Sequence, residues 1–186
     1  MKQFSLFLIL IASCQINVNK ANYYSEYYSE GTIKMFLQAG AYYTNNQFIE
    51  ADSLYNLVIA SSVDKINMSM PVEANPFYYK AAICFQLGKD DSTLYYFSKV
   101  VPFATDSTDI LMMRAQAYNN LGKADSSIIV CNKILSLQKD SAVALFIRGD
   151  NYFKMGKYDQ ACKDLNYAKS NGISTSDLDE QLRKCK

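Results

Sequence analysis

Residues 149–168 read GDNYFKMGKYDQACKDLNYA, and their order of small, large and turn-forming residues decides the fold. Gly156 predicts a tight turn, because glycine reaches the left-handed backbone conformation at little cost. On either side, small residues (Gly149, Ala161) stand where two helix backbones would approach, and Tyr152 and Leu165 stand where the helices would interlock. The stretch therefore predicts two short antiparallel helices joined at Gly156.

The same pattern recurs along the chain with a constant period. The tripeptides Leu87-Gly88-Lys89, Leu121-Gly122-Lys123 and Met155-Gly156-Lys157 place their glycines 34 residues apart, twice. Asn46 replaces the glycine in the earliest copy, and asparagine is the usual second choice at such a position. A period of 34 residues is that of the tetratricopeptide repeat (TPR), and this sequence resembles that family. The resemblance implies an all-α fold, a right-handed α-solenoid of about four TPR helix-turn-helix units with a C-terminal capping helix.

The predicted TPR domain covers residues 32–175. We expect repeats at 32–65, 74–107, 108–141 and 142–175, with an insertion at 66–73 that forms a long loop or extends the preceding helix. Residues 176–186 are expected to form a polar cap helix, in which Leu178 and Leu182 are spaced to cover the last apolar face of the stack.

Residues 14–31 are expected to form a tether that runs into a cluster of tyrosines. Tyr23, Tyr24, Tyr27 and Tyr28 follow helical spacing, which suits a short amphipathic helix covering the first repeat, a flexible linker or a strip that binds a partner. Gly31 and Thr32 then indicate a break and a helix N-cap.

The first residues have the composition of an export signal. Lys2 supplies a positive charge, and Phe4 to Ile11 form an apolar run too short to span a bilayer. Ile11-Ala12-Ser13-Cys14 resembles the lipobox of bacterial lipoproteins, which implies removal of residues 1–13 and lipidation (palmitate) of Cys14. A plain secretory signal and an uncleaved anchor are the alternatives. Gln15 lacks the aspartate associated with retention in the inner membrane, which favours the outer membrane, facing the periplasm.

Composition argues against several classes of function. The net charge is +1, so a nucleic-acid binder with a basic face is not indicated. The chain has no histidine, the commonest general base and metal ligand, and its acidic residues are spaced as helix caps and first-turn residues. We therefore expect a non-enzymatic protein with no cofactor and no metal site.

The cysteines other than Cys14 fall into two groups. Cys84 and Cys131 lie on interior positions of the repeat pattern, which predicts buried free thiols. Cys162 and Cys185 would meet as a disulfide if the last helix folds back on the fourth repeat.

The first helix of each repeat lines the concave surface in the TPR family, and the resemblance implies a groove for a partner there. Its predicted lining is rich in aromatic residues and methionine: Phe36, Tyr43, Tyr78, Tyr79, Phe85, Met112, Gln116, Asn119, Phe146, Asp150 and Phe153. Aromatic anchors dominate binding hot spots, and methionine adapts to varied partners. Phe36, Gly40, Tyr79, Asp109 and Met113 occupy the places where chaperone-binding relatives clamp a C-terminal carboxylate, and none of them can make that clamp's charge-assisted hydrogen bonds.

The sequence thus favours a protein–protein interaction scaffold, a lipoprotein of the bacterial cell envelope that binds a protein or peptide and acts in the assembly of envelope complexes. A ligand-binding envelope protein that recognises glycan or cell-wall fragments through the same aromatic groove is the alternative.

Overall fold

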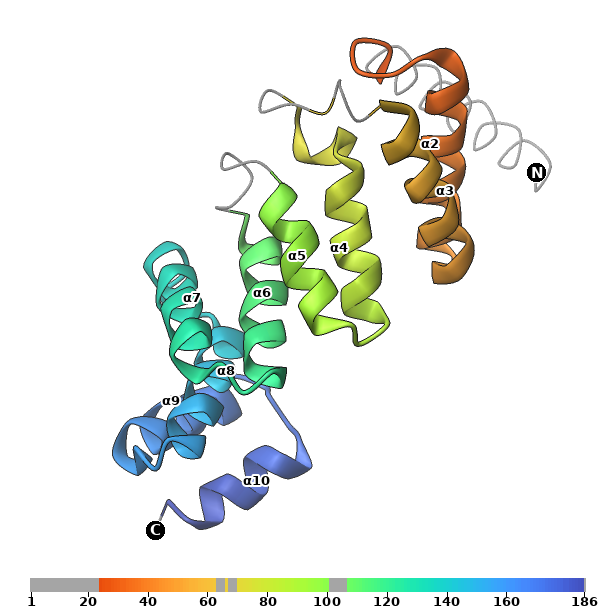
Figure 1. Cartoon of the computed structure of the whole chain (residues 1–186). Coiled ribbons are helices and arrows are strands. Elements are labelled where there is room, and N and C mark those ends of the chain that lie inside the picture. The colour runs from red at the N-terminus through yellow and green to blue at the C-terminus, as the bar shows by residue number, and fades with distance from the viewer. Residues whose placement is uncertain (1–23, 63–65, 67–69, 101–106, 186) are drawn as a thin grey trace, which may run out of the picture. The chain divides into compact units, whose positions relative to one another are not determined.

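The computed structural model describes residues 24–62, 66, 70–100 and 107–185, and all regular elements within these ranges are helices (Figure 1). The chain divides into two compact units, of which the first ends at Ile83 and the second begins at Cys84. The first unit holds α2 (Glu30–Thr44), α3 (Phe48–Ser62), a 3-10 turn at Val72–Ala74 and most of α4 (Pro76–Gln86). The second unit holds α5 (Asp90–Lys99), α6 (Thr108–Asn120), α7 (Ala124–Leu137), α8 (Ala142–Lys154), α9 (Tyr158–Ser170) and α10 (Ser176–Arg183). The all-α prediction is confirmed.

The predicted turns within the helical pairs are present. Asn46 has a φ of 60°, and Gly88, Gly122 and Gly156 have φ values of 67°, 69° and 74°. At Gly122 the backbone N–H donates to the carbonyl of Asn119 at 3.0 Å, and the next N–H donates to the carbonyl of Tyr118 at 2.9 Å. These bonds satisfy carbonyls at the end of α6 and reverse the chain into α7.

The start of the first pair differs from the prediction. Thr32 does not cap α2, because the helix already begins at Glu30 and the side chain of Ser29 accepts a hydrogen bond from the Thr32 N–H at 3.3 Å. α3 is described as far as Ser62, whose carbonyl accepts a hydrogen bond from the Ile66 N–H at 3.2 Å, and the residues between them lie outside the described ranges. The predicted insertion is described at residue 66 and at residues 70–73. It leads into the 3-10 turn, after which the Asn75 side chain accepts a hydrogen bond from the Phe77 N–H at 2.9 Å at the start of α4.

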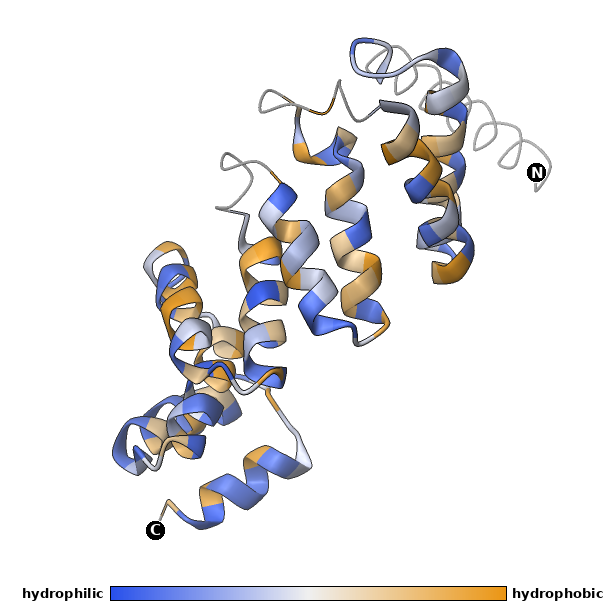
Figure 2. Ribbon diagram, viewed as in Figure 1, coloured by the Kyte–Doolittle hydropathy of each residue, from blue (hydrophilic) through white to orange (hydrophobic). Residues whose placement is uncertain are grey.

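In the second unit, small residues lie where the helices approach most closely. A β-carbon added to Gly149 in α8 would lie 2.9 Å from the side chain of Leu165 in α9, which is fully buried. Apolar and polar residues alternate along these helices (Figure 2). The buried apolar positions of α6, α7 and α8 form one cluster, which includes Leu111, Cys131 and Ile147.

Two buried side chains also join α6, α7 and α8 by hydrogen bonds. The hydroxyl of Ser127 in α7 donates to the carbonyl of Ala115 in α6 at 2.8 Å. The amide of Asn151 in α8 donates to the same hydroxyl at 3.0 Å and to the carbonyl of Ile147 at 2.7 Å. Because both side chains are buried, these bonds replace the water that the Ser127 hydroxyl and the Asn151 NH2 group lose on folding, whereas the side-chain oxygen of Asn151 has no partner among the described residues.

The predicted C-terminal cap is present. Thr175 caps α10 by accepting a hydrogen bond from the Leu178 N–H at 3.1 Å, and Leu178 is fully buried against Ala161 and Leu165 of α9. Leu182 packs against the same cluster.

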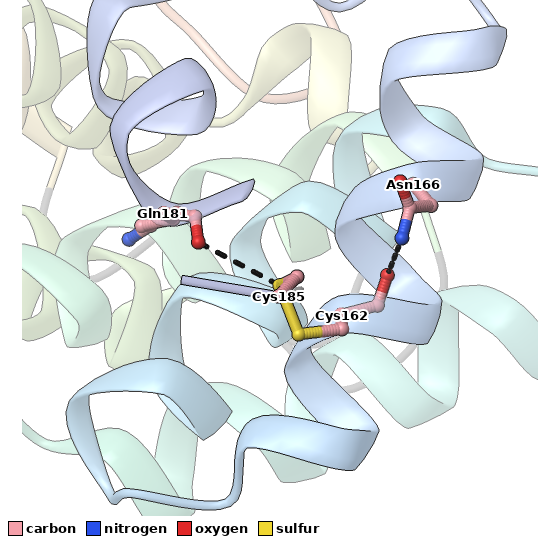
Figure 3. The surroundings of a disulfide bond; sticks show 4 residues. All are labelled: Cys162, Asn166, Gln181 and Cys185. Atoms are coloured by element: carbon pink, nitrogen blue, oxygen red, sulfur yellow. Dashed lines mark hydrogen bonds between the residues drawn. A yellow bond between two sulfur atoms is a disulfide. The ribbon is translucent and has the colours of Figure 1, made fainter. Parts of the chain in front are cut away.

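A disulfide between Cys162 in α9 and Cys185 joins the cap covalently to the last pair (Figure 3). The last helix therefore does fold back on the fourth repeat, and the disulfide that the sequence left open is formed. Among the described cysteines, Cys84 and Cys131 are free and buried, as predicted.

Candidate functional site

The predicted groove residues fall in both units, and each unit is described by itself. The first unit contains Phe36, Tyr43, Tyr78 and Tyr79. The second unit contains Phe85, Met112, Gln116, Asn119, Phe146, Asp150 and Phe153.

Phe36 is not an accessible groove residue, and its prediction needs correction. Only 2% of its surface is exposed. The rings of Tyr24 and Tyr28 lie over it, with centroids 5.0 and 5.4 Å from its own, and the Tyr28 hydroxyl donates to the carbonyl of Ala74. The described part of the tyrosine cluster therefore covers the first repeat, as one of the sequence interpretations proposed, but residues 25–28 do so as a turn and not as a helix.

Beside Phe36 the first unit contains a tyrosine-lined cavity of about 360 Å³. Its wall consists of aromatic residues, one leucine and small residues, and none of the lining residues is charged: Tyr24, Phe36, Leu37, Gly40, Ala41, Tyr43, Thr44, Tyr55 and Tyr79. Tyr43 and Tyr79 are half-buried, with ring centroids 6.0 Å apart. Three predicted groove residues, Phe36, Tyr43 and Tyr79, thus do meet at one cavity. The rings of Tyr78 and Tyr79 form a T-shaped pair with centroids 5.2 Å apart.

Tyr55 is the wall residue that the sequence analysis missed. It occupies a position in α3 where the repeat pattern places a large core residue, and its ring stacks on that of Tyr79 at 5.1 Å. Its side chain is fully buried, and its hydroxyl has no hydrogen-bond partner among the described residues. The signal in the sequence was that Tyr55 carries a hydroxyl at an interior position of the second helix, while the first helix of the same repeat contains a glycine, Gly40.

Three tyrosines of this cavity, Tyr43, Tyr55 and Tyr79, have pKa values raised by burial and stay neutral. Burial raises the pKa of Tyr55 far above its ordinary value, and the neighbouring tyrosines Tyr79 and Tyr24 raise the pKa further. Burial likewise raises the pKa of Tyr79 and of Tyr28. A neutral phenol both donates and accepts, so this wall offers hydrogen bonds but no charge.

In the second unit, two predicted groove residues belong to a polar network that joins α6, α8 and α10. The amide of Asn119 donates to the carboxylate of Asp150 at 2.8 Å, and Lys154 donates to the side-chain oxygen of Asn119 at 2.9 Å. Gln181 of the cap donates to the other Asp150 oxygen at 2.6 Å. Because Asn119 is only 7% exposed, it positions Asp150 and Lys154 through its hydrogen bonds and is too buried to contact a partner itself.

The apolar groove residues of the second unit are half-buried. Met112 and Phe146 pack against the buried cluster of α6, α7 and α8, and Phe146 also reaches the cluster under the cap. Phe153 packs on that second cluster, and the ammonium group of Lys184 lies 5.4 Å from its ring centroid. Side chains of this kind leave apolar surface for a partner.

The two remaining groove positions are also half-buried. Gln116 donates to the side chain of Asn120 at 2.7 Å. Phe85 lies in the last turn of α4.

A second cavity, of about 350 Å³, opens between α8 and the cap. In contrast to the tyrosine-lined cavity, most of its wall residues are charged: Asp150, Phe153, Lys154, Asp177, Glu180, Gln181 and Lys184. Asp150 is already paired with Lys154 at 2.7 Å, and charges of both signs line the wall.

Within the described ranges, no group of three or more cysteine, aspartate or glutamate side chains could hold a metal ion. Burial raises the pKa of Cys131 to about 12, so this thiol stays protonated and is a poor nucleophile at neutral pH. Nor do the described helices include one that is long and apolar enough to cross a membrane. Cys14 lies outside the described residues, so its lipidation stays a prediction.

Comparison with known proteins supports the interpretation of the repeats. Models of the tetratricopeptide repeat match residues 108–141 and 143–171, close to the last two predicted repeats. A comparison with curated proteins finds no match.

Several solved structures share the fold. The TPR protein YrrB superposes with a TM-score of 0.69 at 16% identity, over 96% of this chain and 89% of its own. The MamA protein gives a TM-score of 0.68 at 18% identity, over 84% and 81% of the two chains. TTC0263, a TPR protein of Thermus thermophilus, gives 0.56 at 16% identity, over 83% and 80%.

The same fold is indicated by the repeat period, the turn geometry, the matched repeat models and the structural neighbours. The protein carries tetratricopeptide repeats and has the all-α fold of a TPR solenoid.

Proposed function

We propose that the chain is a non-enzymatic scaffold that binds a protein or peptide on the first helices of its repeats. The observation that carries this proposal is the set of half-buried aromatic and methionine side chains on these helices, including Tyr43, Met112, Phe146 and Phe153. They are anchored from below by core contacts, so they lose little side-chain freedom when a partner covers them. YrrB, which has the same fold, is described as a TPR protein with an unusual peptide-binding site, which supports a peptide or protein partner.

Site-specific photocrosslinking in cells tests the proposed surface. A benzophenone amino acid at Tyr43 or Gln116, on first helices, is expected to crosslink a partner protein that mass spectrometry can identify. The matched control is the same amino acid at Ile129, which is 68% exposed but lies on α7, a second helix. Crosslinks from Ile129 alone, or none from any position, would show that the first helices are not the binding surface.

We further propose that a lipid on Cys14 attaches the scaffold to the bacterial envelope, at the outer membrane facing the periplasm, where it acts in assembling envelope complexes. The support is the lipobox-like sequence ending at Cys14. Two or more acyl chains are enough for stable anchoring.

Changing Cys14 to alanine is expected to abolish incorporation of radiolabelled palmitate and to release the protein from the membrane fraction. Cys131→Ala is the matched control and should stay labelled, because Cys131 is a buried, protonated thiol. A labelled, membrane-bound Cys14→Ala protein would refute the anchor.

A further inference from the structure

We propose that the tyrosine-lined cavity of the first unit is an anchor pocket for one neutral aromatic side chain with a polar tip, best a tyrosine, of the bound partner. This inference rests on the proposed function, since it names what the scaffold would recognise in its partner. It starts from the buried hydroxyl of Tyr55, which has no hydrogen-bond partner among the described residues.

A buried hydroxyl without a partner costs roughly 1–3 kcal/mol, so folding alone favours phenylalanine at this position. The oxygen lies at the cavity wall beside Gly40, where an added β-carbon would be 3.6 Å away. Gly40 is therefore the position at which α2 passes the Tyr55 hydroxyl without a side chain of its own. A ligand group entering there would supply the missing hydrogen bond.

The electrostatics of the wall select a neutral occupant. None of the lining residues is charged, and two of the tyrosines, Tyr24 and Tyr79, already direct their hydroxyls to the carbonyl of Glu73, each at 3.3 Å. A carboxylate or ammonium group entering this cavity would lose water without gaining an opposite charge. Lysine, arginine, aspartate and glutamate side chains are therefore disfavoured.

Size and shape favour an aromatic ring over a sugar chain. A volume of about 360 Å³ lies near the lower end for ligand pockets, roughly 300–1,000 Å³, and suits a single-ring group. The walls present ring edges and faces, with which another ring packs favourably. A sugar would bring several hydroxyls, and the cavity offers them few free partners.

Access to the hydroxyl requires a side chain to move. Tyr55 is fully covered, whereas Tyr43 is half-buried and follows Gly40 by one helical turn in α2. Tyr43 lines the same cavity, and we assign it as the side chain whose rotamer changes to expose Tyr55, because rotamer changes of this kind are common on binding.

The test uses p-cresol, the side chain of tyrosine as a free molecule, with the full mature chain. Resonances of 13C-labelled tyrosines are followed by NMR during titration of p-cresol, toluene or methyl glucoside. We expect p-cresol to shift Tyr43, Tyr55 and Tyr79 saturably and toluene to bind about fivefold more weakly, since one hydrogen bond is lost. Tyr55→Phe should weaken the binding of p-cresol by a similar factor and leave the affinity for toluene unchanged. Tyr95→Phe, at an exposed tyrosine outside the cavity, should change neither affinity.

Gly40→Leu keeps every tyrosine and fills the cavity, so it should abolish p-cresol binding. The proposed pocket is overturned if p-cresol and toluene bind with equal affinity or if the Tyr55→Phe protein binds p-cresol normally. It is also overturned if methyl glucoside binds more tightly than p-cresol, or if p-cresol causes no saturable shift. Failure here is distinct from failure of the scaffold, because photocrosslinking can still capture a partner when p-cresol does not bind. Conversely, p-cresol can bind a protein that captures no partner.

Discussion

Replacing Cys162 and Cys185 with serine is expected to lower the free energy of unfolding of the second unit by about 3 kcal/mol. The two cysteines are 23 residues apart in sequence, and closing a loop of this length restricts the unfolded chain by roughly that amount. Without the bond, α10 keeps its apolar contacts through Leu178 and Leu182, the exposed ion pair of Asp179 with Lys169, and hydrogen bonds such as that from Gln181 to Asp150. Urea unfolding followed by circular dichroism measures the change, and hydrogen exchange should show faster exchange in α10.

Reduction of the native protein provides the control for this prediction. Dithiothreitol should shift the native urea midpoint to that of the double variant and should leave the variant unchanged, because the described free thiols, Cys84 and Cys131, form no disulfide. If the variant and the native protein share one urea midpoint under oxidising conditions, the disulfide contributes nothing to stability.

Asp164→Ala is expected to destabilise the second unit by about 3 kcal/mol, the lower end of the range for breaking a buried ion pair. The Asp164 side chain is 6% exposed and receives two hydrogen bonds from Arg148, at 2.7 and 2.9 Å. Its removal leaves the guanidinium, 22% exposed, without its opposite charge. The bond from Arg148 to Asn132 at 2.6 Å remains, which keeps the expected loss at the lower end.

The matched control is Asp179→Ala, which removes an ion pair of similar length from the same unit. Asp179 lies 2.6 Å from Lys169, but both side chains are more than half exposed. Such surface pairs contribute about 0–1 kcal/mol. Guanidinium denaturation should therefore separate the two variants clearly, and equal midpoints would show that burial does not strengthen the pair from Arg148 to Asp164.

The helical pairs and their turns could be predicted because the repeat pattern is local. A glycine or asparagine with positive φ ends each first helix, and small residues such as Gly149 lie where two helices touch. The C-terminal cap could be predicted by the same reasoning, because Leu178 places an apolar side chain over the apolar end of the last helical pair. These features depend on residues a few positions apart, and the sequence shows them directly.

The binding surface was predicted less well because it depends on contacts distant in sequence. Phe36 has the right position on its helix, but Tyr24 and Tyr28 cover it, and Tyr28 is held by a residue 46 positions later, Ala74. Tyr55 occupies a position where the repeat pattern places a core residue, and only its surroundings show a hydroxyl without a partner at a cavity wall. Burial by a neighbouring segment leaves no periodic signal in the sequence.

The buried hydrogen bonds between α7 and α8 also bear on how similar units recognise their correct neighbours. Residues 34 positions before Asn151 and Ser127 are Ala117 and Thr93, so the preceding repeats lack this amide–hydroxyl pair. Chains of similar units risk docking the wrong repeats during folding or between two molecules. A wrong docking would bury Asn151 or Ser127 without a partner, whereas apolar side chains could exchange places at little cost. The hydrogen bond between Asn151 and Ser127 thus distinguishes the interface of the last two repeats from the preceding one and disfavours docking of either repeat against a wrong neighbour.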